Sequence, residues 1–200
     1  MRLLRRSSVS LDFLVAGLGN PGKRYSRSPH NVGFMVIEEL ARRNDVSMRS
    51  KFSGQVGDLS LGSSRLVLLK PMTYMNDSGR SVSPAMRFFK LSTEALLLVH
   101  DDVDLGLGRI QIRAGGGFAG HKGLRSIATH IGSSDFLRVR VGVGRPSGND
   151  YRSVSDYVLS PFASGVNVEE IVVRAADAVE SIVCDGFEEA QLRHNGEVSV

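Results

Sequence analysis

The order of apolar and polar positions along the chain predicts strands that alternate with helices. We expect a first strand at 11–16, in which residues 13–16 are apolar. The run at 95–100 is apolar up to His100 and is typical of a strand buried on both faces. The segments 53–61 and 65–70 flank a Gly-Ser turn, so we expect two strands there, the second ending at Pro71. These segments provide the first four strands of the predicted sheet.

Two further segments alternate between apolar and polar residues. Residues 109–113 read RIQIR, and residues 136–144 carry their valines on one face and their arginines on the other. A period of two residues is typical of a strand whose faces lie in different surroundings. We therefore add both segments to the sheet.

Apolar residues recur at helical spacing in four segments, which are 32–43, 78–90, 121–132 and 168–183. In the second of them Pro84 removes a backbone donor. We therefore expect this helix to begin at Ser83, with the proline in its first turn. Gly132 is placed to end the third helix.

Strands that alternate with helices predict an α/β fold, here one domain with a mixed, twisted β-sheet flanked by helices. The length of 200 residues suits one domain with a full core. We assign that domain to residues 11–195 and expect the basic residues 1–10 to form a disordered extension. No apolar run is long enough to span a bilayer, and we expect a cytoplasmic protein with no membrane partner.

Charge is unevenly distributed along the chain. Residues 1–150 contain 22 Lys and Arg against 12 Asp and Glu, which gives +10, whereas residues 151–200 contain 3 against 9, which gives −6. A basic surface of this kind attracts a polyanion, but a solubilising surface explains the charge equally well. The single cysteine, Cys184, excludes an internal disulfide, and we expect it to be a small core residue.

The segment GLGNPGKRY at 17–25 contains the pattern G-x-G-x-x-G after an apolar strand. A dinucleotide site needs a helix to open at the third glycine, and an acidic residue at the end of a second strand. Here a polar stretch with Pro29 follows instead, and the acids at the required distance, Glu38 and Glu39, lie inside a predicted helix. The surroundings of the pattern therefore exclude a dinucleotide site.

Polar side chains instead follow the predicted strands, where open α/β sheets place their ligands. Asn20, Tyr25 and His30 follow the first strand, while His100 ends the run at 95–100 and Asp101 comes directly after it. A carboxylate beside an imidazole sets its tautomer and raises its basicity, so that the free nitrogen can deprotonate water. A divalent-metal site is the alternative, with ligands from His100, Asp101, Asp102 and Asp104.

Two more segments contribute candidate residues. KPMTYMNDSG at 70–79 presents Tyr74, Met75 and Asn76 after a strand, although Asn76 also suits a helix cap. RAGGGFAGHKGLRSI at 113–127 is a glycine-rich loop that enters a helix. Its backbone N–H groups, with Lys122 and Arg125, suit a phosphate or a carbonyl group.

Taken together, these segments resemble the bacterial peptidyl-tRNA hydrolase family. The matching pieces are GLGNPGKRY…HNVGF, KPMTYMNDSG, VHDDVDL, GGGFAGHKGLRSI and FLRVRVGVGRP, in the order and spacing of the family over about residues 13–187. The resemblance implies a monomeric α/β enzyme, a carboxylic ester hydrolase that frees tRNA from peptidyl-tRNA after premature termination of translation. It implies neither a metal nor another cofactor.

Carried over by position, the resemblance makes His30 the general base, Asp101 its orienting carboxylate and Asn20 a hydrogen-bond donor near the scissile carbonyl. It makes substrate contacts of five residues, which are Tyr25, Tyr74, Met75, Asn76 and Lys122. Lys122 is a departure, because the family usually has asparagine there. Lysine cannot accept a hydrogen bond and adds a charge. A non-catalytic RNA-binding relative is the alternative from another class, and the retained His30 and Asp101 favour the enzyme.

Overall fold

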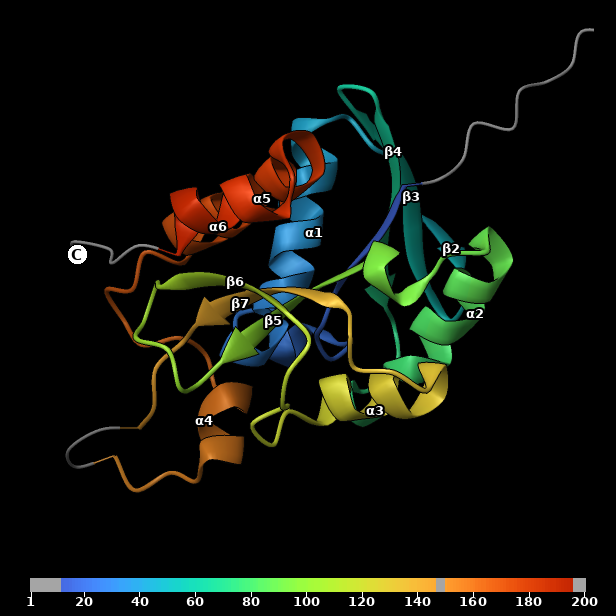
Figure 1. Ribbon diagram of the computed structural model, residues 1–200. Helices are drawn as coiled ribbons and strands as arrows, with labels where there is room; N and C mark the ends of the chain where they lie inside the picture. The colour runs from blue at the N-terminus through green and yellow to red at the C-terminus, as the bar shows by residue number, and fades with distance from the viewer. Residues whose placement is uncertain (1–11, 147–149, 196–200) are drawn as a thin grey trace, which may run out of the picture.

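The computed structural model describes residues 12–146 and 150–195, and these contain a seven-stranded mixed sheet in the order β2-β3-β4-β1-β5-β7-β6 (Figure 1). The expected extension at 1–10 lies outside the described residues. The predicted α/β fold with a mixed sheet is confirmed. The strands are β1 (Phe13–Gly17), β2 (Arg49–Lys51), β3 (Gly54–Leu61), β4 (Ser64–Pro71), β5 (Leu96–Asp102), β6 (Ile110–Ala114) and β7 (Leu137–Gly142).

Four neighbouring strands run in the same direction. β1 pairs in parallel with β4 and β5, and β5 pairs in parallel with β7, whereas β2, β3 and β6 complete the two sides of the sheet by antiparallel pairing. The carboxyl ends of β1, β4, β5 and β7 therefore meet at one edge. All candidate chemistry in the sequence follows one of these ends or enters from a loop beside them.

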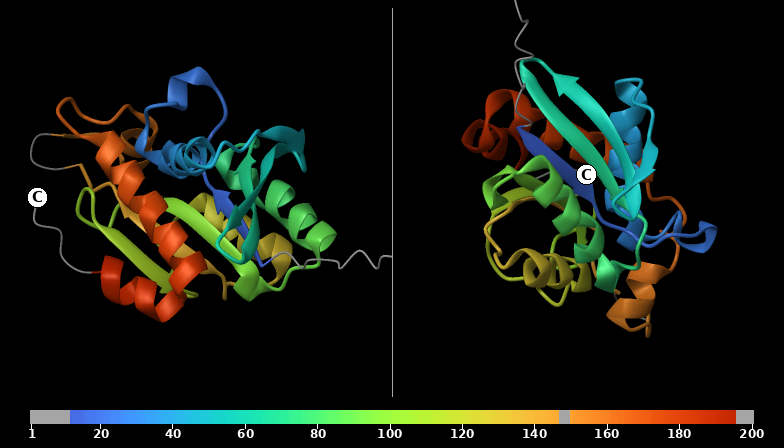
Figure 2. Two further views of the ribbon diagram at one scale, coloured as in Figure 1. Left: turned by 90° about the horizontal axis from the view of Figure 1, so that it is seen from above. Right: turned by 90° about the vertical axis from the view of Figure 1, so that its right-hand side faces the viewer.

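Helices cover both faces of the sheet (Figures 1 and 2). α1, α5 and α6 pack on one face around Val15, Leu68, Val99 and Val141, and α2 and α3 pack on the other around Leu14, Leu69 and Leu98. The helices are α1 (Val32–Arg43), α2 (Gly79–Phe89), α3 (Lys122–Ile131), α4 (Val154–Leu159), α5 (Val168–Asp185) and α6 (Phe187–His194). Gly132 ends α3 in the left-handed conformation, as predicted.

Helix α2 begins earlier than predicted. Pro84 lies inside the helix, which starts at Gly79 and not at Ser83. The reason is tertiary packing, because α2 and α3 approach so closely that a Cβ on Gly79 would lie 2.5 Å from the Ser126 carbonyl oxygen. Burial of this first turn against α3 offsets the backbone hydrogen bond that proline cannot make.

Three elements were not predicted, and one residue was placed wrongly. The sequence reasoning missed β2, α4 and α6, which are short. Cys184 is exposed and not in the core, because it lies on the outer face of α5 while its neighbours Ile182 and Val183 point inward. The alternation at 136–144 is correct, but the arginine face is not simply solvated, since Arg138 is buried.

Two glycines, one at the end of β1 and one at the start of α1, allow these elements to pack closely. A Cβ on Gly17 would lie 2.0 Å from the Gly33 carbonyl oxygen, and a Cβ on Gly33 would lie 2.3 Å from the Leu18 amide nitrogen. Real Cβ atoms do not approach other atoms so closely. The two glycines thus let the start of α1 press against the carboxyl end of β1, which brings the segment before α1 to the edge of the sheet.

Candidate active site

One cavity of about 380 Å³ lies at the carboxyl edge of the sheet. It is lined by all eight residues to which the family resemblance gave a role, namely Asn20, Tyr25, His30, Tyr74, Met75, Asn76, Asp101 and Lys122. These residues come from the ends of β1, β4 and β5 and from the start of α3. The parallel strands therefore bring four distant chain segments together around one cavity.

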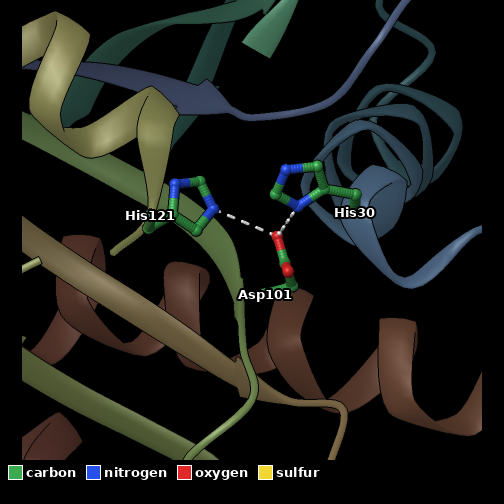
Figure 3. Close-up of side chains that lie close together, drawn as sticks. All are labelled: His30, Asp101 and His121. Carbon is green, nitrogen blue, oxygen red and sulfur yellow. Dashed lines mark hydrogen bonds and ion pairs between the residues drawn. The ribbon is translucent and has the colours of Figure 1, made fainter. Parts of the chain in front are cut away.

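His30 and Asp101 form a direct hydrogen bond across the cavity wall. His30 lies in a 3₁₀ turn at Pro29–Asn31, just before α1, and Asp101 is buried near the end of β5. The distance from His30 Nδ1 to Asp101 Oδ1 is 2.8 Å (Figure 3). An ionised carboxylate only accepts, so Nδ1 carries the proton. The other ring nitrogen, Nε2, is then an acceptor that can take a proton.

A second imidazole meets the same carboxylate oxygen. His121 Nε2 lies 3.1 Å from Asp101 Oδ1, and the ring stands before the first residue of α3 (Figure 3). Its Nδ1 accepts a hydrogen bond of 3.3 Å from the Leu124 amide, so it also caps the helix. Because Nδ1 accepts this hydrogen bond, the ring proton is on Nε2, which donates to Asp101. The sequence reasoning missed His121, whose only signal was its place at the end of a glycine-rich loop.

Asp101 is ionised in this setting. Burial by itself would raise the pKa of the carboxyl, yet the nearby His30 and His121 imidazoles hold the pKa of Asp101 well below its usual range. A charged carboxylate between two N–H donors orients both rings. It also stabilises the imidazolium that forms when His30 takes a proton.

Asn20 is held so that its amide faces the cavity. Its Oδ1 accepts a hydrogen bond of 2.8 Å from the Met75 amide, and its own backbone N–H donates to Asn31 Oδ1 at 2.8 Å. Asn31 Nδ2 in turn donates to the Asn20 carbonyl at 2.9 Å. With the oxygen occupied, the Nδ2–H groups of Asn20 are left to donate into the cavity that the residue lines.

The rest of the cavity is part apolar and part polar. Tyr74, Asn76 and Lys122 are exposed at its rim, whereas Met75 is buried in its wall. Four residues of the unpredicted helix α4 close another side, which are Val154, Ser155, Val158 and Leu159. Figure 1 shows α4 apart from the two helical layers, beside this edge of the sheet. An apolar wall opposite polar groups suits a ligand of mixed character.

The metal site considered from the sequence does not form from its four residues. Asp102 is paired with Arg140 at 2.8 Å, and Asp104 is paired with Arg145 on the outside of the loop. A different group, His30, Asp101 and His121, has donor atoms within 4.8 Å of one another. That spacing suits either a hydrogen-bonded triad or three ligands of a divalent ion.

Comparison with known proteins agrees with the resemblance. A family model described as peptidyl-tRNA hydrolase matches residues 14–199. The chain belongs to the peptidyl-tRNA hydrolase family. It is 47% identical to the peptidyl-tRNA hydrolase of Sorangium cellulosum (strain So ce56) over 185 residues, which cover 91% of this chain and 83% of the relative. The protein of the same name from Geotalea uraniireducens (strain Rf4) is 44% identical over 91% of this chain and 95% of the relative.

The fold agrees with solved structures of the family. The crystal structure of peptidyl-tRNA hydrolase from Acinetobacter baumannii superposes with a TM-score of 0.82 at 36% identity, covering 93% of this chain and 96% of that one. Family membership makes this chain a hydrolase that acts on carboxylic esters. Among the helices of residues 12–146 and 150–195, none has the length and apolar character needed to cross a bilayer.

Proposed function

We propose that the chain hydrolyses the ester between the peptide and the 3′ end of tRNA in peptidyl-tRNA, with water activated by His30 and Asp101. The observation that carries this proposal is the 2.8 Å hydrogen bond from His30 Nδ1 to Asp101 at the cavity. It leaves Nε2 of His30 as a base for water. Activity of this kind recycles tRNA after premature termination of translation.

The proposed reaction has two steps. A water molecule gives a proton to His30 Nε2 as its oxygen adds to the ester carbonyl carbon, and Asn20 Nδ2 donates to the oxygen that becomes negative. The tetrahedral intermediate then collapses, the bond from carbon to the ribose oxygen breaks, and the His30 imidazolium returns its proton to that oxygen. Peptide carboxylic acid and free tRNA leave, and His30 is neutral again.

The other cavity residues are proposed to bind the substrate on either side of the ester. Tyr25 and Tyr74 offer aromatic faces to the terminal nucleotide and the peptide, and Met75 packs beside them. Asn76 offers amide groups to a peptide bond. The exposed Lys122 supplies a positive charge at the rim. We also propose that the protein acts as a 21.7 kDa monomer in the cytoplasm, which sedimentation velocity and cell fractionation test directly.

The decisive experiment measures release of N-acetyl-amino acid from N-acetyl-aminoacyl-tRNA by purified protein. We expect His30→Ala to lower kcat by about 10²- to 10⁴-fold, the usual contribution of a general base. His130→Ala is the matched control, because this exposed histidine of α3 lies outside the cavity. A His30→Ala variant as active as the wild type would exclude the proposed mechanism.

A divalent-metal enzyme is the second candidate, favoured by the close grouping of His30, Asp101 and His121. The same assay separates the two. We expect turnover to be unchanged after dialysis against EDTA and after addition of Mg²⁺, Mn²⁺ or Zn²⁺. Loss of activity in EDTA that one of these ions restores would favour the metal.

A further inference from the structure

A third histidine, His100, lies behind the proposed active site and has no part in the chemistry described above. It is the residue before Asp101 on β5, and only 2% of it is exposed. Its ring is too deep to touch a substrate in the cavity, which it does not line. Its neighbours, however, are the groups on which the proposed mechanism depends.

His100 binds the backbone of Asp101. The distance from His100 Nδ1 to the Asp101 carbonyl oxygen is 2.7 Å, and because a carbonyl only accepts, Nδ1 carries the proton. The pairing of β1 with β5 ends at Gly17 and Val99, with a last bond from the Leu18 amide to the Val99 carbonyl. Carbonyls two residues apart on a strand point to the same side. The Asp101 carbonyl therefore points toward the β1 side of β5, at a level where β1 no longer pairs with β5. The His100 ring supplies the hydrogen-bond donor in place of β1.

His100 also packs against the second imidazole of the site. Its ring and that of His121 meet edge to face, with centroids 5.0 Å apart and an interplanar angle of 74°. His121 in turn lies 5.1 Å from the His30 ring, centroid to centroid. His100 thus binds the backbone of Asp101, while His30 and His121 bind its carboxylate. Three imidazoles surround one aspartate.

This arrangement has a cost in folding free energy. Nε2 of His100 is buried and finds no hydrogen-bond partner within the described part of the chain, and a buried acceptor without a donor is unfavourable. Burial, and then the neighbouring His121, lower the pKa of His100 well below its usual range. The ring is therefore neutral at pH 7. The charged groups that face it are Asp101 on its own strand and Arg138 and Arg140 on β7. A phenylalanine would fill the same space without the unpaired nitrogen.

We propose that His100 is a positioning residue, whose Nδ1–H holds the Asp101 backbone so that the carboxylate stays between His30 and His121. This inference rests on the proposed function, because it assigns a role within the same site. The donor is the essential feature of the residue, and the ring contact with His121 is secondary. The two features can be separated by substitution.

The test compares His100→Phe, which keeps a ring without a donor, with His100→Asn, which keeps a donor near the position of Nδ1 without a ring. We expect His100→Phe to lower kcat by about 10- to 100-fold with KM for N-acetyl-aminoacyl-tRNA within about twofold of the wild type. We expect His100→Asn to recover kcat to within about fivefold. In a plot of kcat against pH, the acid limb should shift in His100→Phe and not in His100→Asn.

Stability is measured in parallel, and each variant is assayed at a temperature where circular dichroism shows it to be folded. If His100→Phe does not fold, His100→Met replaces it as the variant without a donor. Wild-type kcat in His100→Phe would overturn the proposal, as would equal loss in both variants with a raised KM, which indicates a structural role alone. Failure of the proposed function is recognised separately, since His30→Ala would then remain active.

Discussion

At the scale of single residues, hydrogen-bond direction decides what the site can do. The Leu124 amide donates to His121 Nδ1, which forces the proton onto Nε2 and toward Asp101. The Met75 amide donates to Asn20 Oδ1, which turns the Asn20 donors toward the cavity. In both cases a backbone N–H, held by the fold, selects the orientation of a polar side chain. The functional groups are therefore oriented before any substrate arrives.

Lys122 allows a prediction at this scale. Replacing Lys122 by Asn removes one positive charge from the rim of the cavity, where a phosphate of the tRNA 3′ end would pass. We expect KM for N-acetyl-aminoacyl-tRNA to rise about 3- to 10-fold, and the slope of log KM against log salt to fall by about 0.7 to 1. Steady-state kinetics between 50 and 300 mM KCl measure both. Lys90→Asn, the same change at an exposed residue that follows α2 and lies outside the cavity, is the control. Identical kinetics for Lys122→Asn and wild type would show that the lysine does not meet the substrate.

Candidate residues at the ends of strands could be predicted from the sequence, and the pairing of His30 with Asp101 from the resemblance, but the contacts of His121 and His100 could not. His30 and Asp101 were candidates because each follows a predicted strand, and the resemblance assigned their roles. His121 was missed because its role depends on the direction of a loop that carries no apolar periodicity. The role proposed for His100 requires knowing where β1 leaves the sheet. Sequence patterns describe residues on one element, whereas these contacts join separate elements.

At the scale of elements, an ion-pair cluster joins α1 to α5. Arg43 pairs with Glu39 on its own helix at 2.8 Å and with Asp177 of α5 at 2.7 Å. Side-chain hydrogen bonds from Arg42 and Arg43 lower the pKa of Glu39 to about 2. The apolar faces of both helices were predicted from their spacing, but the cluster was not. It needs the crossing of two helices whose paired residues, Arg43 and Asp177, lie 134 residues apart in the chain.

Glu39 therefore predicts how stability depends on pH. A carboxyl whose pKa is lower in the folded state stabilises the fold above its unfolded pKa of about 4.5, and this contribution is lost as pH falls toward 2. We expect Glu39→Gln to reduce the free energy of unfolding by about 1 kcal/mol at pH 7, after allowance for solvent screening, and by progressively less below pH 4.5. Urea unfolding of both proteins at pH 7, 4.5 and 3 checks this. Glu188→Gln, at an exposed position of α6, is the control, and a pH-independent difference for Glu39→Gln would contradict the prediction.

At the scale of the whole molecule, the uneven charge of the sequence becomes a difference between faces. Seven of the nine acidic residues after position 150 lie on α5 and α6, which cover the face of the sheet that α1 shares. The cavity lies at the edge beside α3 and is lined mainly by the basic part of the chain, with α4 from the acidic part on one side. The sequence predicted the imbalance but could not choose between a solubilising surface and a binding surface. The fold favours binding, since it keeps the acidic helices away from the face that carries α3.

This separation predicts that salt weakens binding of the full tRNA substrate, but not of a small substrate that carries only the ester and the terminal nucleoside. Contacts between arginines and tRNA phosphates release counterions, so KM for N-acetyl-aminoacyl-tRNA should rise roughly tenfold or more between 50 and 200 mM KCl. N-acetyl-aminoacyl-adenosine carries no phosphate, and its KM should change by less than about twofold over the same range. The comparison isolates the tRNA backbone, because both substrates present the same ester to His30. An equal response of the two substrates would show that the basic surface does not bind tRNA, and the positive charge would then serve solubility alone.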